Sequence, residues 1–141
     1  MNLDEIKACI PHREPFLWLD EIVGMEENSI HARKVIPTDL DLFRGHYPEQ
    51  PILPGVILCE AAMQASAVFI AKSGIVAEGK IPVATRLNNT QFRSMVKPGD
   101  TLDIHVTLSE KMGPAYFFTG KVMVGKKTAA RMEFAVTATE G

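Results

Sequence analysis

The sequence lacks the features that mark several common classes of protein. It has only two cysteines, Cys9 and Cys59, and its acidic N-terminus, residues 1–5, has no apolar core of the kind that a secretory signal needs. We therefore expect reduced thiols rather than a disulfide, and a buried structural role for Cys59, which no nearby basic residue activates. Histidines and cysteines with the spacing of a metal site are also missing, so we expect no metal and no cofactor.

Long runs of one chemical kind are missing as well. The net charge is −2 and there is no long basic run, which argues against nucleic acid as a partner, because phosphate binding needs clustered cations. The longest apolar run, residues 56–71, contains Glu60 and Gln64 and is shorter than the ~20 apolar residues of a membrane span. With 46% apolar and 23% charged residues, the chain is expected to form a single cytoplasmic domain over residues 1–141, without membrane insertion.

A stiff loop presents one histidine. Pro48, Pro51 and Pro54 follow His46 closely in the chain. Because proline fixes φ and has no backbone N–H, this stretch is expected to form neither a regular helix nor a strand. His46 is therefore predicted to project from an irregular loop, where its imidazole is available for acid or base chemistry.

Glu60 lies a short distance further along, in the surroundings of a buried helix. Its neighbours at i±3 and i±4 are three apolar residues and Gln64, so no cation of its own helix neutralises it. Such a carboxylate either faces solvent as an exception or is desolvated, with a raised pKa that makes it a proton donor. His46 and Glu60 together form a candidate acid/base pair.

Hydrophobic periodicity predicts an α+β domain with one long helix and about six antiparallel strands. Asn2 and Glu5 have the form of a capping box at the start of a short first helix. Gly74 is expected to end the long helix, which is apolar almost all round and is predicted to be wrapped by a curved sheet. The predicted elements are helices over 3–9 and 56–73, a hairpin of 16–23 and 30–36, a long connection over 39–55, and strands over 81–92, 101–109, 116–124 and 128–138.

Three groups of residues give the chain a resemblance to a known family. They are Pro11-His12-Arg13-Glu14-Pro15-Phe16-Leu17 with Asp20, then Gly45-His46-Tyr47-Pro48 through Pro51 and Pro54-Gly55-Val56 to Glu60 and Gln64, and finally Phe92 through Val96 with Pro98-Gly99-Asp100. On these residues the chain resembles the hot-dog-fold 3-hydroxyacyl-acyl carrier protein dehydratases of bacterial type II fatty acid synthesis. The resemblance implies a hot-dog fold, in which a curved antiparallel sheet wraps around one long central helix.

The same resemblance implies a reaction and a set of site residues. The reaction is the loss of water from a 3-hydroxyacyl thioester, which gives a trans-2-enoyl thioester. By resemblance His46 is the base and Glu60 its acid partner, and a single histidine that performs both steps stays open as an alternative. The backbone at Gly55 and Val56 is expected to bind the thioester carbonyl, since the first amides of a helix are unpaired and lie at the positive end of its dipole. The further residues expected to bind substrate are Tyr47, Met63 and Gln64.

Partners also follow from the resemblance. The substrate is expected to arrive on acyl carrier protein, whose acidic surface would meet Arg93 and Lys97. The segment 88–91 carries fewer cations than the family usually has at this place. Family members form homodimers, often three such dimers together, in which the histidine and glutamate of one site belong to different chains, and the same assembly is expected here.

Two other functions are kept as alternatives. A hot-dog acyl thioesterase shares the long helix but uses a carboxylate to activate water, and the Gly-His-Tyr-Pro loop argues against it. A catalytically idle acyl-binding hot-dog protein is opposed by the intact His46 and Glu60. The remaining histidines are expected to have lesser roles, His12 as a structural or loop-orienting group and His31 and His105 as ordinary surface groups of strands.

Overall fold

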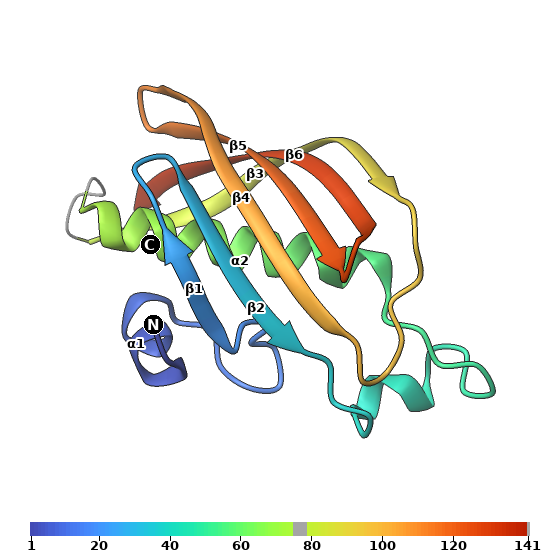
Figure 1. Ribbon diagram of the computed structural model, residues 1–141. Helices are drawn as coiled ribbons and strands as arrows, with labels where there is room; N and C mark the ends of the chain where they lie inside the picture. The colour runs from blue at the N-terminus through green and yellow to red at the C-terminus, as the bar shows by residue number, and fades with distance from the viewer. Residues whose placement is uncertain (75–78, 141) are drawn as a thin grey trace.

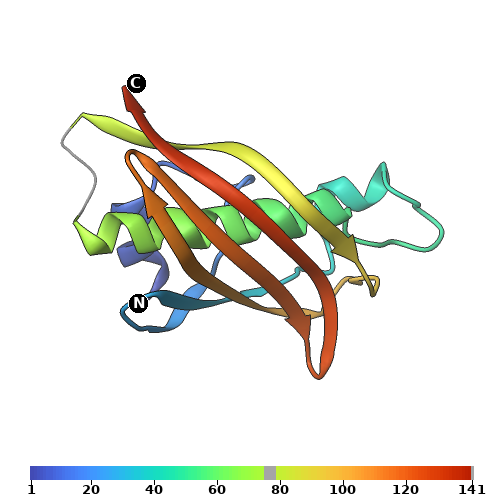
Figure 2. The ribbon, with the colours of Figure 1, turned by 90° about the horizontal axis from the view of Figure 1, so that it is seen from above.

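A 19-residue helix, α2 (Gly55–Ser73), runs across the concave face of a six-stranded antiparallel sheet (Figures 1 and 2). The computed structural model describes residues 1–74 and 79–140. The fold confirms the predicted hot-dog architecture. Along the sheet the strands follow the order β1 (Glu21–Met25), β2 (Ser29–Val35), β4 (Thr101–Met112), β5 (Ala115–Val124), β6 (Lys127–Glu140) and β3 (Lys80–Phe92).

Alternation of apolar and polar residues decides which face of the sheet meets the helix. In β4, Leu102, Ile104 and Val106 are buried, whereas the residues between them are only partly buried. Successive side chains of a strand point to opposite faces, so the apolar set covers α2 and the polar set faces outward. The predicted strands of the C-terminal half are confirmed by β3 to β6, with ends that differ by a few residues.

The long helix is confirmed over its whole predicted length and begins one residue earlier, at Gly55. Eleven of its residues are buried, and it ends at Gly74, whose φ of 69° is the left-handed conformation that glycine adopts without strain. By length and composition α2 could cross a membrane, with a mean hydropathy of 1.4, but 61% of that window is buried within the chain. Since the sheet wraps around it, α2 is the core helix of the domain.

The first predicted strand was wrong at its start. Residues 16–20 form no strand, and β1 begins only at Glu21. The backbone N–H of Trp18 donates to Gln64 Oε1 of α2 at 2.8 Å, so this amide bonds to the helix instead of a neighbouring strand. A buried glutamine in α2 therefore holds the segment 16–18 as a loop against the helix.

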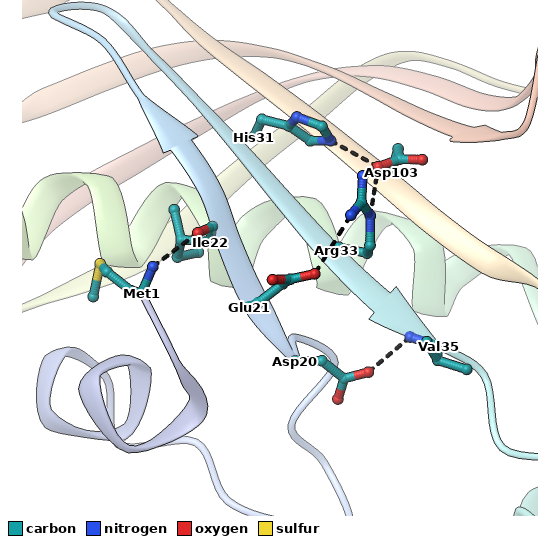
Figure 3. Close-up of polar contacts among 8 residues, drawn as sticks. All are labelled: Met1, Asp20, Glu21, Ile22, His31, Arg33, Val35 and Asp103. Atoms are coloured by element: carbon teal, nitrogen blue, oxygen red, sulfur yellow. Dashed lines mark hydrogen bonds and ion pairs between the residues drawn. The ribbon is translucent and has the colours of Figure 1, made fainter.

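The N-terminal segment is tied to the sheet by polar contacts. Helix α1 (Leu3–Cys9) begins with the predicted capping box of Asn2 and Glu5, in which each side chain accepts from the other residue's backbone N–H. The amino group of Met1 donates to the carbonyl of Ile22 at 2.8 Å (Figure 3). The N-terminus and the end of β6 lie near the end of α2, whereas the connection 36–54 lies near its start (Figures 1 and 2).

Two histidines predicted as ordinary surface groups belong to an ordered polar cluster on the outer face of the sheet. His31 and Arg33 both donate to Asp103 Oδ1, at 2.7 and 3.0 Å (Figure 3). The rings of His31 and His105 are stacked, with their centroids 4.2 Å apart. Burial, and then the charge of His31, lowers the pKa of His105. Cross-strand pairing in the sheet brings these residues together, which the prediction from single strands did not include.

Candidate active site

His46 lies in the connection between the short 3₁₀ helix η1 (Asp41–Arg44) and α2. Its Nδ1 lies 2.9 Å from the carbonyl oxygen of Ile52. Because a carbonyl can only accept, Nδ1 carries the proton and the neutral ring has its lone pair on Nε2. The loop thus orients His46 as a base whose basic nitrogen faces away from Ile52.

Tyr47 turns the chain beside this histidine. Its φ of 54° lies in the left-handed region, which is strained for a tyrosine. The rings of Tyr47 and His46 meet edge to face with centroids 4.9 Å apart, and the Tyr47 side chain is otherwise exposed. Strained backbone of this kind is concentrated at functional sites.

The start of α2 leaves backbone donors without a partner inside the helix. Pro54 is the N-cap and provides no side-chain hydrogen bond to the helix. The amides of Gly55 and Val56 are at the first two helical positions, where no intrahelical acceptor exists. A Cβ atom on Gly55 would lie 2.8 Å from Cδ1 of Phe92, so glycine lets the Phe92 ring cover this end of the helix.

A groove of about 810 Å³ joins the loop and the helix start. It contains three of the residues predicted for the site, His46, Gly55 and Val56, together with several cations from the segments that face them. The residues that line it are His46, Ile52, Leu53, Pro54, Gly55, Val56, Leu58, Phe92, Arg93, Ser94, Met95, Val96, Lys97 and Lys127. An imidazole base and free helix amides therefore share one groove of the size that binds small molecules.

Glu60 does not line this groove. It is five residues beyond Gly55 on α2, which is about 7–8 Å along the axis and about 140° around it. Its half-buried side chain points towards the loop of residues 11–18. Within one chain, the predicted acid therefore does not line the groove that contains the predicted base.

Among the described residues, two polar groups contact the carboxylate of Glu60, both at the same oxygen. Gln64 Nε2 donates to Oε2 at 2.9 Å, and His12 Nε2 lies 3.7 Å from Oε2. Gln64 is fully buried and also donates to the carbonyl of Phe16, so its amide group is held in one orientation. His12 belongs to a loop 48 positions before Glu60 in the sequence, so it is not part of α2. Its contact is consistent with the expectation that α2 itself places no cation beside Glu60.

Sequence reasoning missed the contact between His12 and Glu60. His12 was predicted to be a structural or loop-orienting group, and no periodicity connects a loop residue with a helix residue so far away in the chain. The Pro-rich composition of residues 11–15 was the one available signal, since it indicates a fixed loop.

The other predicted site residues are found within the helix. Met63 is partly buried and packs against the core, and Gln64 is fully buried. Cys59 is also buried, and burial raises the pKa of its thiol, as expected of a structural cysteine. Among the residues that the structure describes, there is no group of three or more histidine, cysteine or acidic side chains that could hold a metal ion.

Comparisons with known proteins identify the family of the chain. A FabA-like domain model matches residues 10–133. The chain is 36% identical over 135 residues to the 3-hydroxyacyl-[acyl-carrier-protein] dehydratase FabZ of Novosphingobium aromaticivorans, covering 94% of this chain and 85% of the relative. It is equally identical over 135 residues to FabZ of Rickettsia bellii, covering 95% of this chain and 93% of the relative.

Among solved structures, the dehydratase heterocomplex ApeI:P from Xenorhabdus doucetiae has the same fold, with a TM-score of 0.81 at 18% identity over 96% of this chain and 91% of that chain. The E. coli PaaI protein has a TM-score of 0.66 at 18% identity, over 83% of this chain and 81% of that one. These structural likenesses concern the fold, whereas the family model and the sequence relatives span nearly the whole chain. The chain belongs to the FabA-like family, among the 3-hydroxyacyl-[acyl-carrier-protein] dehydratases.

Proposed function

We propose that this protein dehydrates 3-hydroxyacyl thioesters carried on acyl carrier protein to trans-2-enoyl thioesters in fatty acid biosynthesis. The observation that carries the proposal is the groove in which His46, with its lone pair on Nε2, lies beside the free amides of Gly55 and Val56. A proton on the carbon next to a thioester becomes acidic only if the developing enolate oxygen is stabilised. Helix-start amides supply that stabilisation, and a neutral imidazole supplies the base.

The proposed reaction uses one base and one acid. His46 Nε2 removes the proton from Cα while the thioester oxygen accepts hydrogen bonds at the start of α2. The bond between Cβ and the hydroxyl oxygen then breaks as Glu60, in its protonated form, gives its proton to that hydroxyl. Water leaves, and Cα and Cβ share the new double bond.

Within one chain Glu60 does not line the groove of His46, which supports a site that two subunits share. Strand β3 is at the edge of the sheet and is exposed over most of its length, and it carries large apolar side chains that its own chain leaves uncovered. They are Ile81, Val83, Leu87 and Phe92, and Val56 at the start of α2 is 68% exposed. Exposed apolar sheet edges are typical of surfaces that bind another protein chain. We propose a homodimer in which His46 of one chain faces Glu60 of the other.

Cations around the groove favour an acidic carrier. Arg93, Lys97 and Lys127 line the groove and are exposed, and no carboxylate is among the described residues that line it. Complementary charge guides the encounter of partners and their orientation. We propose that acyl carrier protein docks at this rim. We also propose that the reaction takes place in the cytoplasm.

The activity is tested by hydration of a crotonyl thioester, followed by loss of enoyl absorbance, with release of free thiol measured in parallel. A dehydratase lowers the absorbance without releasing thiol, a thioesterase releases thiol as the absorbance falls, and an idle acyl-binding protein changes neither signal. The variants His46→Ala and Glu60→Gln are each expected to lower kcat by about 10²-fold or more, as is typical of positioned acid and base groups. The variant Cys59→Ser is the matched control and is expected to remain active.

The shared site is tested by mixing two inactive proteins. Subunit exchange between His46→Ala and Glu60→Gln chains gives hybrid dimers, in which one site has both defects and the other has neither. With random pairing, about a quarter of all sites are intact, so about a quarter of wild-type activity is expected to return. Hybrids that are demonstrably formed but inactive would refute the shared site.

A further inference from the structure

The loop of residues 11–15 brings a second histidine to the proposed acid. His12 Nε2 lies 3.7 Å from Glu60 Oε2, and both side chains are partly buried, with 29% and 26% of their surface exposed. The two residues belong to the same chain, so this contact does not depend on subunit assembly. At 3.7 Å the atoms are slightly beyond hydrogen-bond distance, and contacts of active-site groups often shorten when substrate binds.

The proton of the neutral His12 ring is best accommodated on the nitrogen that faces Glu60. Nδ1 is buried and has no hydrogen-bond partner among residues 1–74 and 79–140. A proton on Nδ1 would therefore be a buried donor without a protein acceptor, which costs about 1–3 kcal/mol. A proton on Nε2 instead faces Oε2 of Glu60, an acceptor 3.7 Å away.

The N–H groups of Gln64 and His12 then both point to one oxygen of the Glu60 carboxyl group. Gln64 Nε2 donates to Oε2 at 2.9 Å, and His12 Nε2 approaches the same atom. In a protonated carboxyl group, one oxygen is a carbonyl that accepts and the other carries the proton and donates. Two N–H donors at Oε2 fit the carbonyl oxygen, which leaves Oε1 for the proton.

We propose that His12 is a positioning residue for Glu60: its neutral Nε2–H, with the Gln64 amide, fixes Oε2 as the accepting oxygen so that Oε1 presents the proton to the departing hydroxyl. The inference rests on the proposed function and deepens it, since it assigns the orientation of the acid. His12 does not touch the substrate, and no proton passes through its ring in the reaction.

A neutral donor differs from a cation at this position. A positive charge beside Glu60 would favour the ionised carboxylate, which has no proton to give. The other charged groups of the loop are engaged elsewhere. Arg13 donates to the carbonyls of Lys7, Ile10 and His12, and Lys7 forms an ion pair with Glu14 at 3.0 Å.

Three substitutions at one position separate the possible roles. His12→Gln keeps a neutral N–H donor, His12→Leu removes the donor, and His12→Lys introduces a charge. We expect His12→Gln to stay within about threefold of the wild-type kcat and His12→Leu to lose about 10- to 100-fold in kcat with little change in KM, because a small misplacement of a reacting group costs up to about 10²-fold. For His12→Lys we expect a comparable loss and an alkaline limb of kcat/KM that moves to lower pH.

The matched control is His31→Gln, which alters another histidine that lies beside a carboxylate, on the outer face of the sheet. It is expected to leave kcat unchanged. Urea denaturation of each variant shows that it is folded. If folded His12→Leu retains wild-type kcat while Glu60→Gln is inactive, the positioning role is refuted and the dehydratase function stands. Equal losses in His12→Gln and His12→Leu would also refute it, since a donor would then be insufficient.

A second measurement does not depend on activity. Two-bond ¹⁵N–¹H correlation spectra of histidine-labelled protein report which ring nitrogen carries the proton. We expect His12 to be protonated on Nε2 alone, and the His12→Gln spectrum identifies its signals by their loss. A ring protonated on Nδ1, or on both nitrogens at the pH of the assay, would overturn the assignment. If the wild-type protein failed to hydrate crotonyl thioester but gave the expected spectrum, the proposed function alone would fall.

Discussion

The fully buried Gln64 is the polar residue on which the local structure around Glu60 depends most, and Gln64→Leu tests this. Gln64 joins α2 to the loop of residues 16–18, because it accepts from the backbone N–H of Trp18 at 2.8 Å and donates to the carbonyl of Phe16 at 2.8 Å. Its third hydrogen bond is to Glu60, at 2.9 Å. Leucine has a similar volume, so the substitution removes the hydrogen bonds while largely keeping the packing.

The expected destabilisation follows from the groups that are left without partners. Trp18 is buried, so its N–H loses its acceptor without gaining water, at a cost of about 1–3 kcal/mol. The Phe16 carbonyl belongs to an exposed residue and can bond to water, so its share is smaller. We expect Gln64→Leu to lower the free energy of unfolding by roughly 2–3 kcal/mol.

Urea denaturation at one fixed protein concentration measures this change, because subunit association would otherwise contribute to the apparent stability. Glu60→Gln is the matched control. It removes the charge but keeps an oxygen that accepts from Gln64, and it is expected to cost less than about 1 kcal/mol. A free energy for Gln64→Leu within about 0.5 kcal/mol of wild type, at an unchanged m-value, would refute the claim that this amide holds the loop to the helix.

Two further predictions concern parts of the fold outside the proposed site. Burial opposes ionisation of Asp103, but hydrogen bonds from His31 and Arg33 outweigh it, so the pKa of this carboxyl is lowered from its ordinary value of 3.8. The stability that the ionised carboxylate contributes is present above pH 3.8 and is lost as the pH falls through the lower pKa of the folded state. The difference in stability between wild type and Asp103→Asn is therefore expected to be about 1 kcal/mol or less and to shrink below about pH 4 in urea titrations. A difference that stays constant with pH would contradict this. Gly120→Ala would bring a Cβ atom to 2.5 Å from Sδ of the buried Met132. This crowding is expected to lower the free energy of unfolding by about 1–3 kcal/mol, measured by urea denaturation. An unchanged free energy of unfolding would mean that the core adjusts freely.

Local patterns determined most of the secondary structure. The alternation in 101–109 and the Gly74 signal at the end of the long helix each depend on neighbours in the sequence, and each was confirmed. The capping box of Asn2 and Glu5 spans only three positions, so it also was predicted from sequence alone. The exception is the segment 16–20, whose apolar residues suggested a strand. The side chain of Gln64 in α2 binds the Trp18 amide, and no pattern within 16–20 contains that information.

The family could also be predicted from motifs in the sequence alone. His46 and Glu60 could be singled out in the same way, because a Pro-rich loop and a lone helical carboxylate are visible in the order of residues. Tertiary structure alone decided where they lie and what touches them. Glu60 does not line the groove of His46, and its neighbour His12 comes from a loop that the fold brings to α2. The stacking of His31 on His105 likewise required the register of β2 against β4. Contacts of this kind depend on how whole elements pack, and elements far apart in the chain acquire fixed positions only when the core forms around α2.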